Sequence, residues 1–385
     1  MSGIGIHDLS VATGHHVLDL ALMAEHLGID PAKYRVGIGQ DEMSIPAPDE
    51  DVVTMAATAA LPIIERHGTD GIRTVLFATE SGIDQSKSAG LFVHQLLGLP
   101  SACRVLELKQ ACYSATAGIQ LATALVQRYP EERVLVIASD VARYALGTSG
   151  EPTQGAGAVA MLIGADAAIL EIEPVTGVHA TDVDDFWRPN DHDTALVDGR
   201  LSITAYLTSL RGAWDDFRAH GGVGLEDIDH VCYHQPFSKM AVKAHAQLGR
   251  HAGVETSAED LEIPARYNRR IGNSYSASLY VALAALLDSD QDLAGRRIGL
   301  FSYGSGSVGE FFTGRVATGY RSALRPGSVP AALDARVPLD FAAYRDLHVA
   351  AAPGSSTDRE TEPVTTGPFR FTGVCGAVRQ YERRA

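Results

Sequence analysis

The feature that most constrains the fold is the alternation of short apolar runs with helical segments. In the first half, strand-like runs at residues 74–79, 104–108 and 133–138 are separated by helical patterns at 88–97 and 111–126. Runs that are apolar on both faces are typical of strands whose sheet is covered by helices on both sides. The sequence therefore predicts an α/β fold built on buried sheets.

The second half of the chain also alternates strand-like runs with helical segments, although no residue-level repeat relates it to the first. After Pro368 a last strand is expected over Phe369–Tyr381, and the Gly-, Ser- and Thr-rich stretch Ala350–Pro368 is expected to be a mobile loop of unknown role. The remaining predicted helices are 51–67, 202–218, 238–250 and 274–288, and the remaining predicted strands are 230–234, 298–302 and 308–316.

Charge and composition exclude several classes of function. The formal net charge of −15 disfavours nucleic acid and anionic membranes as partners. We expect a cytoplasmic protein, because the sequence shows no leader pattern and no apolar run of membrane-spanning length. The four cysteines are scattered, without disulfide or metal-ligand spacing, so free thiols are expected.

One of these cysteines, Cys112, lies where a strand-like run passes into an apolar helical segment. We expect it in the first turn of that helix, where free amide N–H groups and the helix dipole favour a thiolate and can hold an oxyanion. The alternative is a small buried core cysteine, which is the more common fate of a free cysteine. The local sequence supports both readings equally.

Two further titratable residues end predicted strands. Glu80 follows the apolar run Val75–Ala78, a position where α/β folds place functional groups, and burial there would suit it to proton transfer. His234 ends another strand and could exchange protons or donate a hydrogen bond to a carbonyl. Taken alone, the local sequence favours a carboxylate that caps the next element for Glu80, and a histidine bonded to a nearby carbonyl is an ordinary interpretation of His234.

Two glycine-rich loops and a lysine pair complete the set of candidates. Gly304–Gly309 matches a dinucleotide-binding pattern, but the residues after it favour a strand where that fingerprint requires a helix, so a hairpin is expected. Gly150–Gly157 is a second loop of small residues that leads to a strand. Lys239 and Lys243 share one helical face and could meet a phosphate, or could simply be solvated.

Taken together, these segments resemble the bacterial 3-hydroxy-3-methylglutaryl-CoA (HMG-CoA) synthases of the mevalonate pathway. The similar stretches occur in family order as far as about Gly319, and the C-terminal segment beyond is not diagnostic. They are Lys33–Gln40, Ala78–Ser81, Lys109–Tyr113, Gly150–Ala158, Asp185–Pro189, His234–Met240, Gly272–Tyr275 and Phe301–Gly306.

The resemblance implies a thiolase-like fold with two similar α/β halves in a layered αβαβα arrangement, assembled as a homodimer. The expected halves are residues 1–166, which carry Glu80 and Cys112, and residues 167–385, which carry His234 and the glycine-rich hairpin.

The resemblance also implies a reaction and its residues. Cys112 would accept an acetyl group from acetyl-CoA, Glu80 would deprotonate the acetyl methyl, and His234 would polarise the keto group of acetoacetyl-CoA. No metal or redox cofactor is needed, because the CoA thioesters are the substrates. Asp185 is expected in the hydrogen-bond network near His234, and the residues expected to bind substrate or CoA are Asp30, Pro31, Lys33, Thr153, Ser202, Lys239, Lys243, Asn273 and Ser305.

Three alternatives remain at this point. A polyketide β-branching synthase of the same fold would make the same bond on carrier-protein substrates, although the short Gly150–Gln154 stretch and Asp185–Pro189 favour free CoA esters. A thiolase or ketoacyl synthase would share the cysteine, but its usual histidine signatures are not evident. A non-catalytic acyl-CoA-binding protein would not need Glu80, Cys112 and His234 together.

Overall fold

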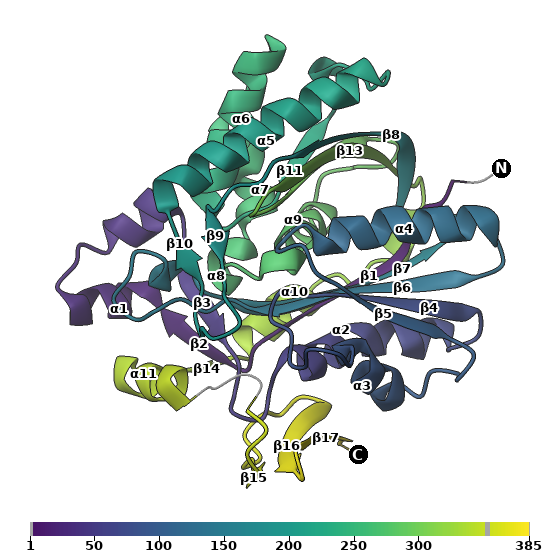
Figure 1. Cartoon of the computed structure of the whole chain (residues 1–385). Helices are drawn as coiled ribbons and strands as arrows, with labels where there is room; N and C mark the ends of the chain where they lie inside the picture. Colours follow the sequence, from purple (N-terminus) through teal and green to yellow (C-terminus); the bar gives the residue numbers. More distant parts are fainter. Residues whose placement is uncertain (1–2, 351–354, 385) are drawn as a thin grey trace.

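The computed structural model describes residues 3–350 and 355–384, and its elements stack in an αβαβα order (Figure 1). Helices α2 (Val52–His67) and α3 (Ala89–Leu96) cover one outer face. Helices α5 (Gly199–Ala219) and α6 (Ser238–Ala252) cover the opposite outer face. Helices α4 (Ser114–Arg128) and α9 (Ser278–Leu287) lie between the two layers of strands.

The two layers of strands repeat one pairing scheme. In the first, β7 is antiparallel to both β1 and β6, and β4 runs parallel to β6 and β5. In the second, β13 is antiparallel to both β8 and β12, and β11 runs parallel to β12. The first layer comprises β1 (Gly5–Thr13), β4 (Ile72–Ala78), β5 (Arg104–Leu108), β6 (Arg133–Val141) and β7 (Ala156–Gly164). The second comprises β8 (Leu170–Ala180), β11 (His230–Tyr233), β12 (Arg297–Gly304) and β13 (Val308–Val316).

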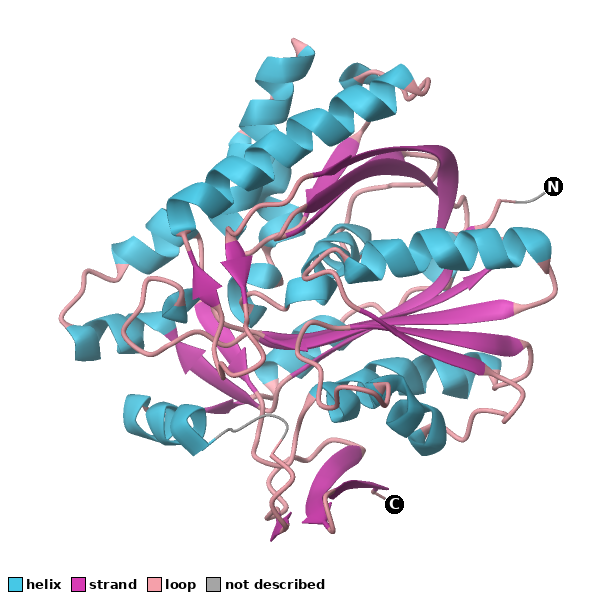
Figure 2. Ribbon diagram, in the orientation of Figure 1, coloured by secondary structure: helices cyan, strands magenta, loops and turns pink. Residues whose placement is uncertain are grey.

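Among the described strands, the two layers are paired with each other at the ends of β1 and β8, where Gly5 pairs with Glu171 and Ile6 with Leu170. Figure 2 shows β8 and β13 arching away from the flatter strands of the first layer. The duplication that the residues did not show is therefore visible in the order and direction of the strands. The boundary at residues 166 and 167 remains a prediction.

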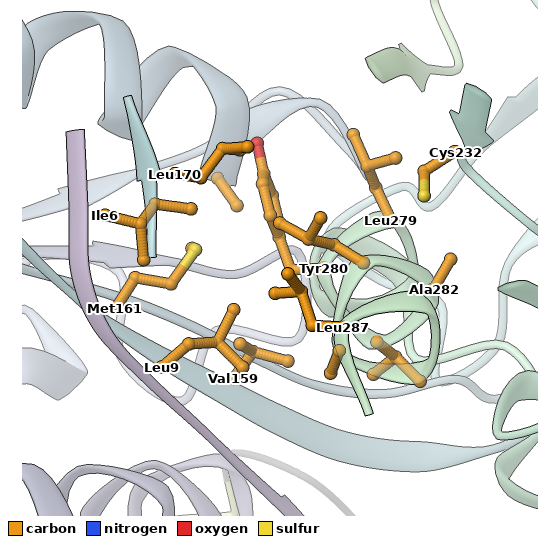
Figure 3. Packing of buried hydrophobic residues seen from close by; sticks show 14 of the residues in the cluster. Ile6, Leu9, Val159, Met161, Leu170, Cys232, Leu279, Tyr280, Ala282 and Leu287 are labelled. Atoms are coloured by element: carbon orange, nitrogen blue, oxygen red, sulfur yellow. The ribbon is translucent and has the colours of Figure 1, made fainter. Parts of the chain in front are cut away.

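The main hydrophobic core fills the space around the central helices (Figure 3). All residues of α9 are buried, as expected for a helix that is apolar on every side. Tyr280 and Leu287 of α9 pack with Leu9 of β1 and Met161 of β7. This packing fixes the central layer against the sheet of the first half.

Most of the predicted elements are present with small shifts at their ends, but the C-terminal prediction was incomplete. The single strand expected over 369–381 is a hairpin, β16 (Phe369–Cys375) and β17 (Val378–Arg383), that turns at Gly376 and Ala377, both with positive φ. The predicted loop 350–368 contains a short strand, β15 (Arg359–Glu360), paired with β16. Residues 351–354 of that loop lie outside the described residues.

Smaller elements connect and cover these layers. Among the described residues, no helix is both long enough and apolar enough to cross a membrane. The small strands are β2 (His16–Asp19), β3 (Glu42–Ile45), β9 (Phe186–Trp187), β10 (Leu196–Val197) and β14 (Val337–Pro338). The small helices are α1 (Leu20–Leu27), η1 (Lys33–Ile38), η2 (Glu151–Thr153), η3 (Leu225–Asp227), η4 (Ala258–Leu261), α7 (Glu262–Ala265), α8 (Asn268–Ile271), η5 (Tyr275–Ala277), η6 (Tyr320–Ser322), α10 (Ser328–Asp334) and α11 (Phe341–Ala350).

Candidate active site

The candidate site lies at the carboxyl ends of the parallel strands of both layers, at the opposite end from the β1–β8 pairing. Glu80 follows β4, Cys112 lies in the connection between β5 and α4, and His234 follows β11. This is the edge at which open α/β sheets place their ligands. Glu80 and Cys112, which are 32 positions apart in the sequence, are in direct contact.

The backbone before Cys112 has a conformation that positions the thiol. Ala111 has a φ of 43°, in the left-handed region that few non-glycine residues adopt. The turn packs against the end of β12, where a Cβ on Gly304 would lie 2.4 Å from the Gln110 carbonyl oxygen. Only glycine allows this close approach between the nucleophile turn and the hairpin of the second half.

The predicted place and ionisation of Cys112 were both wrong in detail. Helix α4 begins at Ser114, so Cys112 precedes the first turn instead of lying in it. The pKa of its thiol is raised well above the usual value, first by burial and then by the negative charge of Glu80. Desolvation and the neighbouring carboxylate therefore oppose the thiolate that the start of the helix was expected to favour.

Cys112 and Glu80 form a hydrogen-bonded pair. The thiol donates to Glu80 Oε1 over 3.0 Å. Burial, followed by the charge of nearby Asp140, raises the pKa of the Glu80 carboxyl to about 8. Both residues thus favour their neutral forms, and Glu80 titrates close enough to neutral pH for its carboxylate form to accept a proton. The contact with the thiol favours a proton-transfer role for Glu80 over a capping role.

Asp140, at the end of β6, holds this arrangement, and the sequence analysis missed it. Its Oδ1 accepts hydrogen bonds from the Thr79 hydroxyl (2.8 Å) and the Glu80 amide (2.9 Å), and from the amide and hydroxyl of Ser81. Its Oδ2 accepts from the amide and hydroxyl of Ser276 in the second half. The only sequence signal was an aspartate at the end of an apolar run, which is weak evidence because a surface turn would show the same pattern.

His234 is 2% exposed and held by its backbone. Its N–H donates to the Phe301 carbonyl over 2.9 Å, and its carbonyl accepts from the Tyr206 hydroxyl over 2.7 Å. Burial lowers the pKa of the imidazole to about 3, so the ring is neutral at physiological pH. Among the described residues, its Nδ1 is buried without a hydrogen-bond partner. A neutral imidazole in this setting can donate one hydrogen bond to a bound oxygen.

The predicted glycine-rich hairpin is confirmed, and Asp185 fixes its tip. Strand β12 ends at Gly304 and β13 begins at Val308. Asp185 accepts from the Gly306 amide over 2.9 Å and from the Tyr303 hydroxyl over 2.8 Å. Asp185 thus reaches the neighbourhood of His234 indirectly, because Tyr303 contacts the ring of Tyr206, which bonds to the His234 carbonyl.

Gln110 links the nucleophile turn to this hairpin. Its side-chain amide donates to the Ser305 carbonyl oxygen over 3.1 Å. This contact brings the backbone of Ser305 close to the turn that carries Cys112. Backbone from both halves of the chain therefore lies beside Cys112, where amide N–H groups could hold a thioester oxygen.

The residues expected to bind CoA fall into two groups. Asp30, Pro31 and Lys33 are exposed at the start of η1, which packs against α6, the helix of Lys239 and Lys243. Thr153 and Asn273 are buried and joined, since the Asn273 amide donates to the Thr153 carbonyl over 2.9 Å. The structure therefore brings distant members of each group together. Ser202 belongs to neither group. It lies in the first turn of α5, where its amide donates to the Asp198 carbonyl.

Three aromatic residues that the sequence analysis did not single out stand beside the nucleophile. Tyr144, Phe186 and Tyr275 pack with Ala142 and Cys112 in one cluster. No group of three or more histidine, cysteine, aspartate or glutamate side chains in the part of the chain that the structure describes is arranged to hold a metal ion.

Comparison with known proteins identifies the family of this chain. The model of the hydroxymethylglutaryl-coenzyme A synthase N-terminal region matches residues 2–168, and that of the C-terminal region matches residues 170–260 and 255–341. The hydroxymethylglutaryl-CoA synthase of Enterococcus faecalis is 42% identical, over 98% of this chain and 99% of that protein. A crystal structure of HMG-CoA synthase complexed with CoA superposes with a TM-score of 0.94 at 36% identity, covering 99% of this chain and 100% of the other.

A carrier-protein relative is more distant. The polyketide biosynthesis 3-hydroxy-3-methylglutaryl-ACP synthase PksG of Bacillus subtilis is 34% identical, over 90% of this chain and 88% of that protein. The thiolase-like α/β fold expected from the resemblance is confirmed by the structural match. Matches to the two regions of the family run from residue 2 to residue 341, well over half of the chain, and this chain therefore belongs to the hydroxymethylglutaryl-CoA synthase family.

Proposed function

We propose that this chain condenses acetyl-CoA with acetoacetyl-CoA and water to give 3-hydroxy-3-methylglutaryl-CoA and free CoA. The observation that carries the proposal is the partly buried, hydrogen-bonded pair of Cys112 and Glu80, 3.0 Å apart, with a neutral His234 at the carboxyl end of β11. A thiol nucleophile, a base of raised pKa and a neutral hydrogen-bond donor are the groups that a condensation through a cysteine thioester requires.

The first step transfers the acetyl group to the enzyme. Cys112 Sγ attacks the carbonyl carbon of acetyl-CoA, and the bond from that carbon to the CoA sulfur breaks. Glu80 accepts the thiol proton through the existing hydrogen bond and returns it to the departing CoA thiolate. The amides of Cys112 and Ser305 hold the oxygen that becomes negative in the tetrahedral intermediate.

The second step forms the carbon–carbon bond. Glu80 removes a proton from the acetyl methyl group, and the resulting enolate attacks the keto carbon of acetoacetyl-CoA. His234 donates a hydrogen bond to the keto oxygen, which becomes the new alkoxide. The alkoxide then takes up the proton that Glu80 removed from the methyl group, so Glu80 returns to its carboxylate form. Water then hydrolyses the Cys112 thioester and restores the thiol.

Free CoA esters are favoured over carrier-protein substrates by the order of similarity. The Enterococcus faecalis CoA enzyme is 42% identical, and the Bacillus subtilis carrier-protein enzyme is 34% identical. The carrier-dependent reaction is the second candidate function, and the acceptor used in the assay separates the two.

Intact-protein mass spectrometry tests the proposal. With acetyl-CoA, we expect one acetyl adduct on Cys112 that disappears when free acetoacetyl-CoA is added and HMG-CoA forms. Glu80→Gln should slow the condensation by about 10²–10⁴-fold, because general-base catalysis is lost. Cys112→Ala should give no adduct at this site, whereas the control Cys103→Ala should behave as the wild type.

Three results would contradict this function. An adduct on another residue would remove Cys112 from its role, and normal condensation by Glu80→Gln would remove Glu80. An adduct that leaves only when the acceptor is bound to a carrier protein would favour the polyketide reaction.

Lys239 and Lys243 are proposed to bind the phosphates of CoA. The chain has a net charge of −15, so a CoA ester needs local positive charge to bind. Both lysines lie in the first two turns of α6, and neither forms a salt bridge within the described residues. Asp30, Pro31 and Lys33 are proposed to flank the same end of CoA, because η1 contacts α6.

Replacing both lysines by alanine should raise the KM for acetyl-CoA about tenfold or more, because charge-assisted hydrogen bonds contribute about 1.5–3 kcal/mol. The KM for an acetyl-pantetheine thioester, which lacks the nucleotide phosphates, should change little. Steady-state kinetics with both substrates checks this. An equal loss for the two thioesters would be inconsistent with phosphate contacts.

We also propose that the chain forms a homodimer through the edge strand β5. This strand ends the sheet order and pairs only with β4 among the described strands. Its Leu106 is 52% exposed, and Leu91 of α3 and Leu121 of α4 are also exposed apolar residues. A bare edge with exposed leucines is a surface that natural proteins normally cover.

Sedimentation equilibrium should give twice the mass of one chain, and Leu106→Glu should shift the protein towards a single chain. A wild-type protein that sediments as one chain would contradict the dimer.

A further inference from the structure

The acyl end of the site is enclosed by an aromatic cluster, defined here as Tyr144, Phe186 and Tyr275. Phe186 meets the other two rings edge-on, with centroid distances of 6.0 Å to Tyr144 and 5.8 Å to Tyr275. The two tyrosine rings are 6.5 Å apart. Cys112 packs against this cluster, which also includes Ala142. The nucleophile is therefore flanked by large flat side chains.

The tyrosines of the cluster lie near both partners of the catalytic pair. Burial raises the pKa values of Tyr144 and Tyr275, and interaction with the ionised forms of Cys112 and Glu80 adds to this rise for both hydroxyls. An acyl group on Cys112 must present its α-carbon to Glu80 for deprotonation. Cys112 contacts Glu80 through its thiol and packs against the aromatic cluster. A substituent on that α-carbon would therefore lie between Glu80 and the aromatic side chains.

The cluster is held by the backbone on both sides. Tyr275 has a φ of 44°, its amide donates to Asn273 Oδ1 over 2.9 Å, and its hydroxyl accepts from the Arg143 amide over 3.3 Å. Phe186 lies in β9, paired with Val197 of β10, and follows Asp185, which bonds to the Gly306 amide. Fixed walls exclude a larger group by steric overlap, because a packed interior tolerates added methylenes poorly.

We propose that the aromatic cluster, with Phe186 as its replaceable wall, limits the acyl group on Cys112 to acetyl and excludes longer acyl chains. The inference rests on the proposed function, since it assumes acyl transfer to Cys112. Acyl-CoA esters with three or four acyl carbons are chemically competent for that transfer. In each case the bond to the CoA sulfur breaks, the bond to Cys112 Sγ forms, and the thiol proton leaves with CoA. The selection is therefore made by space and not by reactivity.

Phe186 is the wall that can be removed most cleanly. Its side chain has no polar atom, so truncation leaves no buried donor or acceptor without a partner. Truncating Tyr275 would remove the acceptor of the Arg143 amide and disturb a strained turn. Trp187, the next residue, is 41% exposed and provides a control on the same short strand.

The test measures acylation rates of Cys112 by rapid mixing and intact-protein mass spectrometry, with acetyl-CoA and butyryl-CoA as separate probes. The wild type should acetylate at least about 100-fold faster than it butyrylates, because one methylene in a shaped pocket changes rates by roughly 10–200-fold. Phe186→Ala should reduce this ratio at least about tenfold. Phe186→Leu should lower it to an intermediate value, and Trp187→Ala should leave it unchanged.

The possible results separate this inference from the proposed function. One outcome is that the wild type is acetylated while Phe186→Ala and Phe186→Leu keep the wild-type ratio of acetylation rate to butyrylation rate. In that case the cluster does not select the acyl group, and the proposed function stands. If the wild type is butyrylated as fast as it is acetylated, the inference also fails. If Cys112 of the wild type takes no acetyl group, the proposed function fails and the inference falls with it. A variant whose circular dichroism shows unfolding is replaced by Phe186→Leu, which keeps most of the apolar volume.

Discussion

The geometry of the site depends most directly on the Asp140 carboxylate. Its Oδ1 accepts hydrogen bonds from the residues after β4, including the amide of Glu80. Its Oδ2 accepts hydrogen bonds from the amide and hydroxyl of Ser276 in the second half. A buried carboxylate with so many donors is costly to move, since each lost partner leaves a buried polar group unsatisfied. Asp140 therefore fixes the backbone of Glu80, the proposed general base, and joins the two halves of the chain at the candidate active site.

Burial is the largest cause of the pKa shifts of all three catalytic candidates. Burial raises the pKa values of Glu80 and Cys112 and lowers that of His234, so each group favours its neutral form. The nearby charge of Asp140 further raises the pKa of Glu80. The result is a base that can both take up and release a proton near neutral pH and an imidazole that acts by hydrogen bonding. A dry, neutral site also suits an enolate, whose charge is then stabilised by oriented donors instead of by water.

The sequence predicted the α/β class and most helices and strands, because buried strands and amphipathic helices leave periodic patterns. It could not predict the duplication, since this appears in strand order and direction and not in residue identity. Glu80, Cys112 and His234 could be selected only through a family resemblance, because each has an ordinary structural interpretation. Asp140, Gln110 and the aromatic cluster were missed because their roles depend on contacts between segments more than 100 positions apart. The raised pKa of Cys112 was also missed, since burial cannot be read from a helix start.

The central claim is that Glu80, with a pKa raised to about 8, is the base that accepts the Cys112 proton. The most direct test is the single-turnover rate of Cys112 acetylation from pH 6 to pH 9.5, in the wild type and in Glu80→Gln. Since only the carboxylate can accept the proton, the wild-type rate should rise about tenfold per pH unit below about pH 8 and level off above it. In Glu80→Gln this rise should be replaced by one at higher pH, where the thiol ionises by itself. A wild-type rate that is constant between pH 6 and pH 9, or the same rise in Glu80→Gln, would contradict the account.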